Sequence, residues 1–301
     1  MNDCPAGTNE AGAAPGCEGC EGQAVCSGTR EEPRDEALAL RLGAIRHKVL
    51  VLSGKGGVGK STVAVQLAGQ LALRGKRVGL LDLDICGPSL ALMLGLQEAS
   101  IVAGPGGWTP AKPPGFGSRL SVVSIAMLLA AGDAAVAWRG PRKHATILRF
   151  LRDVYWSRLD FLIVDTPPGT SDEHLTVVAA LREAMDGAVL VTTASAVAQS
   201  TLRRELDFCD KLKVPVLGLV ENMKGFACPC CGAVEEVFPG PEDPAGSVAQ
   251  FARARGVRYL GSVPLELALG HAADEGRFVA SAAMEAVVAK LLEAIPDDDD
   301  C

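Results

Sequence analysis

Four groups of residues in this chain could do chemistry, and the first is a glycine-rich loop with two lysines. The loop from Gly54 to Ser61 reads GKGGVGKS and fits the pattern G-x-x-x-x-G-K-[ST] between an apolar run and a helical pattern. Its glycines let successive backbone N–H groups turn toward one anion, and the helix start adds its positive dipole end. Lys60 is expected to neutralise β- and γ-phosphate charge, and Ser61 to offer its hydroxyl to Mg²⁺. The expected nucleotide contacts in this stretch are Gly54, Lys55, Gly56, Gly57, Val58, Gly59, Lys60, Ser61 and Thr62.

The second group is a set of carboxylates at strand ends. In LLDLDICGPS, Asp82 and Asp84 alternate, so both lie near the carboxyl end of one strand. In FLIVDTPPGTSDEH, four apolar residues precede Asp165. One acidic residue at a strand end is usually a cap or a surface charge. Three at the edge that carries a phosphate loop predict a metal and water site, with Asp165 binding Mg²⁺ through water.

The third group is four cysteines near the start of the chain. Cys4, Cys17, Cys20 and Cys26 have the spacing C-x12-C-x2-C-x5-C in a stretch rich in Gly, Ala and Glu. Four thiolates on such a chain could bind an iron–sulfur cluster or a tetrahedral zinc, and spacing alone leaves both open. Without a metal the composition predicts a flexible extension.

The fourth group is three cysteines in GFACPCCGAV. Cys228 and Cys231 form C-P-x-C, which offers two thiolates, half of what a [4Fe–4S] cluster needs. A symmetric dimer could therefore bridge one cluster between two such pairs. Cys230 is not expected to be a primary ligand. A thioredoxin-type dithiol is the alternative, but that motif belongs at a helix start.

The remaining cysteines and the histidines are not expected to bind metal. Cys209 shares an apolar stripe with leucines, and this pattern predicts that it packs in the core. Cys86 is expected to be buried, and Cys301 is a thiol of the tail. No ligand spacing links the four histidines, His47, His144, His174 and His271.

Composition limits the class of protein. The chain has 301 residues, 48% of them hydrophobic, and a net charge of −7, which argues against binding nucleic acid. It has no apolar run of about 18 residues, so no membrane span is expected. The first thirty residues resemble neither a secretory signal nor a transit peptide, so the cytosol or nucleus is expected. Thiols stay reduced there, and ten cysteines then favour metal over disulfides.

Alternating apolar strands and helical segments predict the elements that position these residues. A short helix is expected at 35–45, another at 60–74, and a less regular stretch at 96–118. Strands are expected at 48–54, 77–84, 120–127, 161–167, 187–195, 214–222 and 258–265. Such a pattern predicts an α/β fold of three layers, a mostly parallel sheet with helices on both faces. The expected parts are a flexible cysteine-rich extension (1–33), an ATPase domain (34–296) whose last helix ends near residue 295, and an acidic tail (297–301).

The motifs KGGVGKS, DLDICGPS, WRGPRK, VDTPPGTSDEH and LGLVENMKGFACPCCG, with the four-cysteine extension, are similar to one family over residues 1–280. The chain resembles the eukaryotic cytosolic iron–sulfur scaffold ATPases of the Mrp/NBP family, which are MinD-like. The resemblance implies a SIMIBI-class P-loop fold and a slow, dimeric ATPase. It implies that [4Fe–4S] clusters are assembled on paired C-P-x-C motifs and passed to cytosolic and nuclear apoproteins. It also implies a shorter paralogue without the extension as partner, besides downstream cluster-targeting factors.

The resemblance assigns roles that the residues alone do not. It implies that Lys55 reaches the nucleotide of the other subunit, that Asp84 orients the attacking water, and that Asp82 lies near the Mg²⁺ shell. Asn222 matches the position that hydrogen-bonds the base, although a strand-end turn residue is the alternative. The stretch TPPGT would sense the γ-phosphate, and the four N-terminal cysteines would bind a second [4Fe–4S] cluster.

The sequence departs from the family pattern in its first cysteine interval, which is one residue short, and in the extra thiol of Cys230. Glu266 stands where the family commonly has Asp. Three other classes compete. A membrane-recruited MinD-like regulator needs a basic terminal helix, but here four aspartates follow the last helix. A DNA-partitioning ParA ATPase needs a basic surface. A reductase of the nitrogenase iron-protein type uses isolated cysteines rather than a C-P-x-C pair.

Overall fold

The computed structural model describes residues 17, 35–85, 87–128, 140–228, 230–231, 233–238 and 247–295. The predictions for Cys4, Cys20, Cys26, Cys86, Cys301 and the tail at 297–301 fall outside these residues. The chain divides into one unit at Met1–Leu40 and a second at Arg41–Cys301. In the first unit, the carboxylate of Asp35 accepts the backbone N–H of Leu38 at 3.0 Å, at the start of helix α2 (Glu36–Gly43). The three-part division predicted from sequence stays a prediction.

The second unit is built on a seven-stranded sheet in which every strand pairs in parallel with its neighbour. From edge to edge the strands are β11 (Tyr259–Val263), β8 (Val216–Asn222), β7 (Gly187–Thr192), β1 (Ile45–Leu52), β6 (Leu159–Asp165), β2 (Val78–Asp82) and β5 (Leu120–Ser124). All seven strands expected from the sequence are present. Because the strands run in one direction, the loops that follow them meet at one carboxyl edge, where sheets of this kind bind ligands.

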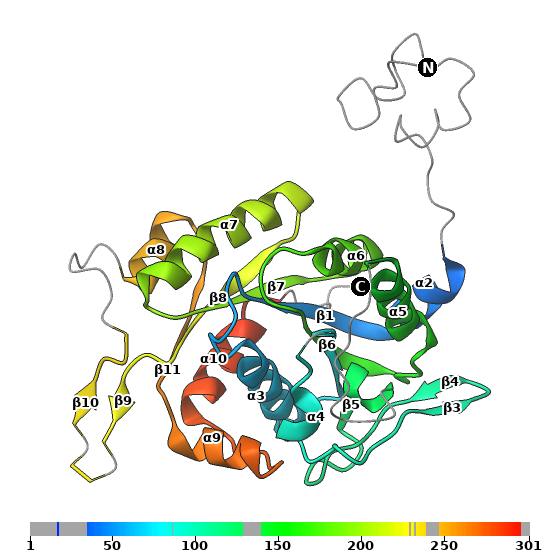
Figure 1. The fold of residues 1–301 in the computed structure, drawn as a ribbon, viewed down its shortest axis with the longest axis horizontal. Helices are drawn as coiled ribbons and strands as arrows, with labels where there is room; N and C mark the ends of the chain where they lie inside the picture. The colour runs from blue at the N-terminus through cyan, green and yellow to red at the C-terminus, as the bar shows by residue number, and fades with distance from the viewer. Residues whose placement is uncertain are drawn as a thin grey trace. The chain divides into compact units, whose positions relative to one another are not determined.

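Helices cover both faces of the sheet (Figure 1). One face carries α3 (Lys60–Leu73), α4 (Leu90–Met93), α9 (Leu267–Asp274) and α10 (Ala282–Leu292). The other carries α5 (Gly140–Asp153), α6 (Asp172–Leu181), α7 (Ala196–Leu212) and α8 (Val248–Ala254). A 3₁₀ turn at Ile125–Leu128 follows β5. The predicted three-layer α/β architecture is therefore confirmed.

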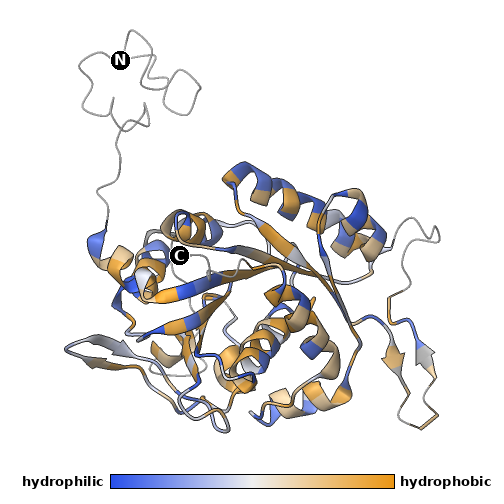
Figure 2. Cartoon of the chain, turned by 180° about the vertical axis from the view of Figure 1, so that it is seen from behind, coloured by the Kyte–Doolittle hydropathy of each residue, from blue (hydrophilic) through white to orange (hydrophobic). Residues whose placement is uncertain are grey.

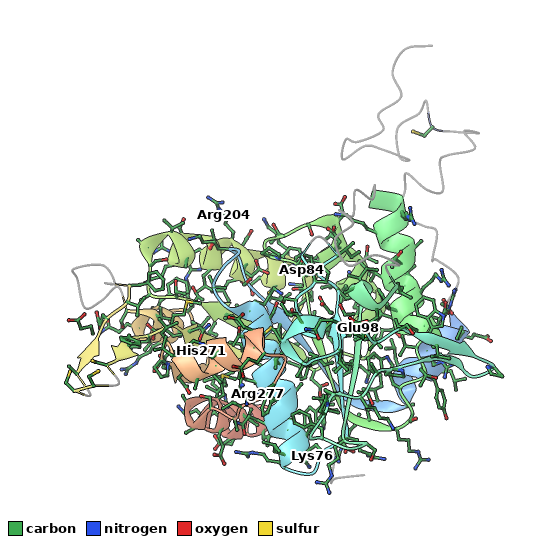
Figure 3. All side chains as sticks on the ribbon, turned by 60° about the horizontal axis from the view of Figure 1, so that its bottom comes forward. Lys76, Asp84, Glu98, Arg204, His271 and Arg277 are labelled. Carbon is green, nitrogen blue, oxygen red and sulfur yellow. The ribbon has the colours of Figure 1, made fainter. Side chains whose placement is uncertain are left out.

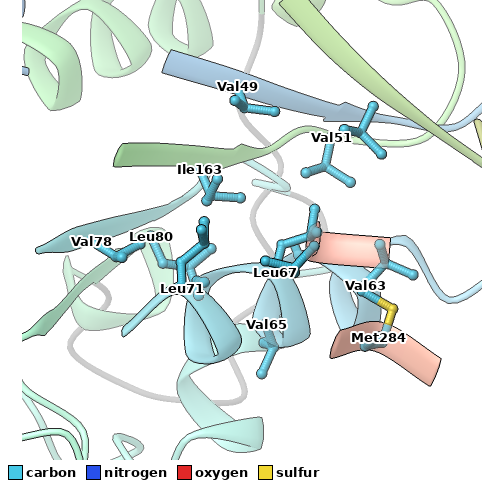
Figure 4. Packing of buried hydrophobic residues seen from close by; sticks show 14 of the residues in the cluster. Val49, Val51, Val63, Val65, Leu67, Leu71, Val78, Leu80, Ile163 and Met284 are labelled. Atoms are coloured by element: carbon cyan, nitrogen blue, oxygen red, sulfur yellow. The ribbon is translucent and has the colours of Figure 1, made fainter. Parts of the chain in front are cut away.

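The core lies between the sheet and the helices. Strands β2 and β7 are buried at every position, as expected for strands covered on both faces. Val63, Leu67 and Leu71 of α3 belong to one buried cluster with Ile163 of β6 and Met284 of α10 (Figure 4). Burying each such side chain contributes roughly 1.5–3 kcal/mol. The outer helices mix hydrophobic and hydrophilic residues, as the colours of α7 show in Figure 2.

The predicted strand boundaries differ from the observed ones by up to three residues. Strand β1 begins at Ile45, three residues before the predicted start, and α2 ends at Gly43. The stretch expected to be less regular contains a short antiparallel hairpin of β3 (Val102–Gly104) and β4 (Gly107–Thr109), which the sequence did not predict. Its Trp108 packs edge-on against Phe150 and lies under the guanidinium of Arg149. These contacts join residues about 40 positions apart, so local pattern could not reveal them.

A second small hairpin follows β8 and carries the fourth group of cysteines. It consists of β9 (Phe226–Ala227) and β10 (Val234–Glu235), paired antiparallel. Among the helices that the structure describes, none has the length and apolar character to cross a bilayer.

Candidate nucleotide and thiol site

The glycine-rich loop connects β1 to α3 and needs its glycines for two different reasons. Gly57 and Gly59 have φ of 79° and 80°, a left-handed conformation that glycine adopts without strain. A Cβ on Gly59 would lie 2.1 Å from Nδ2 of Asn222, and one on Gly54 would lie 2.7 Å from the carbonyl oxygen of Thr201. The loop is therefore held tightly against β8 and α7, in the strand–loop–helix context that the motif predicts.

Lys60, Ser61 and Asp165 form a buried polar group at the base of the loop. Nζ of Lys60 lies 2.5 Å from one carboxylate oxygen of Asp165, and the Ser61 hydroxyl donates to the other at 2.6 Å. Asp165 is fully buried and Lys60 is only 6% exposed. Burial raises the pKa of Asp165, and the charge and hydrogen bond of Lys60 oppose that rise. An ammonium group, a hydroxyl and a carboxylate this close suit an Mg²⁺-bound phosphate chain.

Asp82 lies beside Asp165, because the two residues pair across β2 and β6. It accepts hydrogen bonds from the Ser124 hydroxyl at 2.9 Å and from the backbone N–H of Asp84 at 3.1 Å. Burial, and then the nearby charge of Asp165, raise the pKa of Asp82 to about 7. In this structure the side chain thus supports the backbone of Asp84. Its expected place near the Mg²⁺ shell stays a prediction.

A pocket of about 430 Å³ opens at this edge and brings the predicted loop together with Asp84. Asp84, labelled in Figure 3, is half-buried, and its carboxylate accepts the backbone N–H of Gly87 at 3.3 Å. Lys55 is exposed at the pocket, and Thr62 also lines it. The pocket therefore presents loop, lysines and carboxylate to one ligand.

Sequence reasoning missed the opposite wall of this pocket. That wall consists of residues around α4 and on α9, namely Ser89, Leu92, Met93, Gly270, Ala273 and Asp274. The one available signal was topological, because α9 follows the edge strand β11 and so begins at the carboxyl edge of the sheet.

Asn222, the last residue of β8, contacts the phosphate loop directly. Its side-chain amide donates to the carbonyl oxygen of Val58 at 2.9 Å, and the residue is buried. This contact holds the phosphate loop against the end of β8. The predicted hydrogen bond from Asn222 to a nucleotide base stays a prediction.

The thiols of the second hairpin begin at Cys228, six residues beyond Asn222. Cys228 is half-buried, whereas Cys230 and Cys231 are exposed, and all three are free. The backbone N–H of Cys228 donates to the carbonyl of Ala233 at 2.9 Å, which closes the turn. Hydrogen bonds from the backbone N–H groups of Cys231 and Cys230 lower the pKa of Cys228 and so favour its thiolate. Thiolates are the form that binds iron.

The other described cysteines differ in environment. Of the four N-terminal cysteines, the structure describes Cys17 alone, as a free thiol. Cys209 on α7 is fully buried, and burial raises its pKa to about 12. Its predicted role in core packing is confirmed. Within the part of the chain that the structure describes, no three or more His, Cys, Asp or Glu side chains are placed to hold a metal ion.

Comparison with known proteins decides the family. Residues 44–298 match the ParA-family model described as a NUBPL iron-transfer P-loop NTPase. The chain belongs to this family. A curated relative, the cytosolic Fe-S cluster assembly factor NUBP1 homolog of Brugia malayi, is 46% identical over 281 residues, 91% of this chain and 89% of the relative. The resemblance drawn from the motifs is therefore confirmed.

Two solved structures are similar to this chain. The nucleotide-binding protein of Archaeoglobus fulgidus, solved with ADP, is 32% identical with a TM-score of 0.71, over 87% of this chain and 97% of that one. The cell division ATPase MinD of Pyrococcus furiosus is 19% identical with a TM-score of 0.59, over 82% and 99%. The second likeness shows the fold alone, which is the MinD-like P-loop fold expected from the sequence.

Proposed function

We propose that this protein is an ATP-dependent scaffold that assembles [4Fe–4S] clusters and transfers them to cytosolic and nuclear apoproteins. The observation that carries the proposal is that a short stretch of chain joins the phosphate loop's support to the thiol hairpin. Strand β8 ends at Asn222, which supports the phosphate loop, and the chain reaches Cys228 six residues later. A nucleotide-dependent movement of the loop can therefore reach the thiols through a short segment. The name of the Brugia malayi relative and the iron-transfer description of the family point to the same activity.

The thiols divide into two proposed cluster sites. Cys228 and Cys231 of two subunits together supply four thiolates to one bridging [4Fe–4S] cluster, which is the cargo. Cys4, Cys17, Cys20 and Cys26 hold a second [4Fe–4S] cluster. The working unit is a homodimer, or a hetero-oligomer with a shorter paralogue that lacks the N-terminal extension. Cluster-targeting factors and apoproteins are the downstream partners, in the cytosol and also the nucleus, and neither nucleic acid nor a membrane takes part.

Hydrolysis of ATP is proposed to be slow and to gate loading or release of the cluster. Lys60 would neutralise phosphate charge, and Ser61, Asp165 and Asp82 would hold Mg²⁺. The metal would offset charge on the phosphate oxygens. Asp84 orients the attacking water. Lys55 extends from the exposed start of the loop toward the partner subunit.

Anaerobic reconstitution of the full chain with iron and sulfide tests the proposal. Cys228→Ala/Cys231→Ala should abolish the bridging cluster and the iron-dependent dimer while retaining the N-terminal cluster. Cys230→Ala is the matched control, because it removes an exposed thiol from the same turn. Native mass spectrometry reports iron, sulfide and subunit number together. A wild-type protein that stays monomeric with Mg·ATP, iron and sulfide in excess would exclude the scaffold.

A further inference from the structure

Helix α9 forms the far wall of the nucleotide pocket, and its first turn is built on Glu266. Gly270, Ala273 and Asp274 of this helix line the pocket. Glu266 is the N-cap residue of the helix. Its carbonyl oxygen accepts the backbone N–H of Leu269 at 3.1 Å and that of Gly270 at 3.4 Å. The position of Glu266 therefore decides where this wall of the pocket begins.

The carboxylate of Glu266 is held by Ser281, the N-cap residue of α10. The Ser281 hydroxyl donates to Oε1 of Glu266 at 2.5 Å, within the range of hydrogen bonds from hydroxyl groups to carboxylates. The same hydroxyl accepts the backbone N–H of Met284 at 3.3 Å and so caps α10. Ser281 is only 1% exposed. Its buried hydroxyl thus both donates and accepts within the protein.

The backbone of Ser281 is held by two glutamines of α3, the helix that begins at Lys60. The N–H of Ser281 donates to Oε1 of Gln66 at 3.2 Å, and Nε2 of Gln70 donates to the carbonyl of Ser281 at 2.9 Å. Nε2 of Gln66 also donates to the carbonyl of Val279 at 2.7 Å. Both glutamines are buried. Because an unpaired polar group in the interior is unfavourable, these bonds fix the segment firmly to α3.

Packing holds the same segment against α3. A Cβ on Gly69, between the two glutamines in the sequence, would lie 2.2 Å from the ring of Phe278. Phe278 in turn meets Phe116 edge to face, with ring centroids 5.0 Å apart. The chain from Phe278 to Ser281 therefore lies directly on α3, and it carries the position of α3 over to Glu266.

We propose that Ser281 is a positioning residue for the nucleotide site. It joins α3, whose first residues are Lys60 and Ser61, to Glu266 and so to the wall on α9. The width of the pocket is thus set by buried hydrogen bonds behind the wall. A wall that is already in place binds nucleotide more tightly, because no binding energy is lost in ordering it. This inference rests on the proposed ATP-dependent function and adds to it two residues, Ser281 and Glu266, behind the lining of the pocket.

Substitutions at the two ends of the Ser281–Glu266 bond test the proposal. The probe is Mg·ADP, and isothermal titration calorimetry of the full chain measures its affinity. Ser281→Ala removes the donor and Glu266→Leu removes the acceptor, so each should weaken Mg·ADP binding about tenfold. The double variant should bind no more weakly than either single variant, because all three proteins lack the same bond. Glu266→Gln keeps an acceptor oxygen for the hydroxyl and should bind Mg·ADP like the wild type.

Ser247→Ala is the matched control for the loss of a helix cap. The Ser247 hydroxyl accepts the backbone N–H of Gln250 at 3.3 Å at the start of α8, on the other face of the sheet. Both serine variants should lose thermal stability through the missing cap, whereas only Ser281→Ala should lose affinity for Mg·ADP. Affinity in Ser281→Ala equal to that of the wild type, or a double variant in which the two losses add, would overturn the inference.

The two Glu266 variants keep the test decisive if Ser281→Ala does not fold, because Glu266 is only half-buried. Glu266→Leu should then bind Mg·ADP about tenfold more weakly than Glu266→Gln, and equal affinities would contradict the proposal. Neither iron nor sulfide is present in these titrations. A chain that shows the predicted affinities but assembles no cluster would reject the scaffold and leave this inference standing, whereas a chain that binds no Mg·ADP would overturn both.

Discussion

Glu205 on α7 is a buried carboxyl group whose surroundings differ from those of Asp82 and Asp165. Asp82 and Asp165 are fully buried, but each accepts hydrogen bonds from neighbouring groups. Glu205 is also fully buried, yet neither of its carboxylate oxygens has a partner among the described residues. Burial alone raises its pKa to about 7. Because an unpaired buried charge is strongly unfavourable, Glu205 holds a proton over much of the acid range.

Glu205→Gln should therefore remove a pH dependence of stability. Between the unfolded pKa of 4.5 and the folded pKa of about 7, the folded protein keeps a proton that the unfolded chain releases. The stabilisation is complete below pH 4.5 and is lost as the pH rises through 7. The difference in free energy of unfolding between wild type and variant should fall by up to about 3 kcal/mol from pH 4.5 to pH 8.

Urea unfolding at a series of pH values measures this difference. Glu98→Gln serves as the control, since Glu98 is exposed (Figure 3). Its unfolding free energy should run parallel to that of the wild type. A Glu205→Gln curve that also runs parallel would show that Glu205 is not titrating in the fold.

At the scale of elements, the ends of α4 and α9 cross in direct backbone contact and so hold the missed wall of the pocket in place. A Cβ on Gly276 would lie 2.7 Å from Cα of Gly95, and one on Gly95 would lie 2.7 Å from the carbonyl oxygen of Gly276. Both glycines have φ of 67°. A side chain at either position must therefore push the two helices apart.

Gly276→Ala should weaken Mg·ADP binding about tenfold, because separating α4 from α9 opens the pocket wall. Gly256→Ala is a matched control, with φ of 65° and nothing within 4 Å of the added Cβ. Both variants should lose about 1 kcal/mol of stability through backbone strain. Isothermal titration calorimetry then separates them, and equal affinities would show that the crossing does not shape the pocket.

The elements that the sequence predicted are those whose signal is local. Seven apolar runs of strand length became seven strands, and the loop at Gly54–Ser61 was recognised because motif and context coincide within fifteen residues. The wall on α9 and the β3–β4 hairpin depend on residues far apart in the chain, such as the pair Gly95 and Gly276. The contact between Asn222 and Val58 likewise appears only once β8 is placed in the sheet.

At the scale of the whole molecule, the parallel sheet explains why one edge gathers groups from residue 53 to residue 274. Every strand of the seven-stranded sheet ends there, so the phosphate loop, Asp84 and α9 share one pocket, and the thiol hairpin follows directly from β8. Lys55 is exposed at this edge, whereas Lys60 is buried on Asp165. The two lysines of one loop thus lie in different environments, Lys60 paired inside the subunit and Lys55 open to solvent.

Mixing two inactive variants tests whether Lys55 acts on the partner subunit. Each site of the proposed dimer would use its own Asp84 and the Lys55 of the other chain. Lys55→Ala and Asp84→Asn should each abolish ATP hydrolysis, but a mixed dimer regains one site with both groups intact. Random pairing of equal amounts should restore about a quarter of wild-type turnover. The control is a mixture of Lys55→Ala with Lys55→Ala/Asp84→Asn, which cannot form such a site. If Lys55 served its own subunit, the first mixture would stay as inactive as its components.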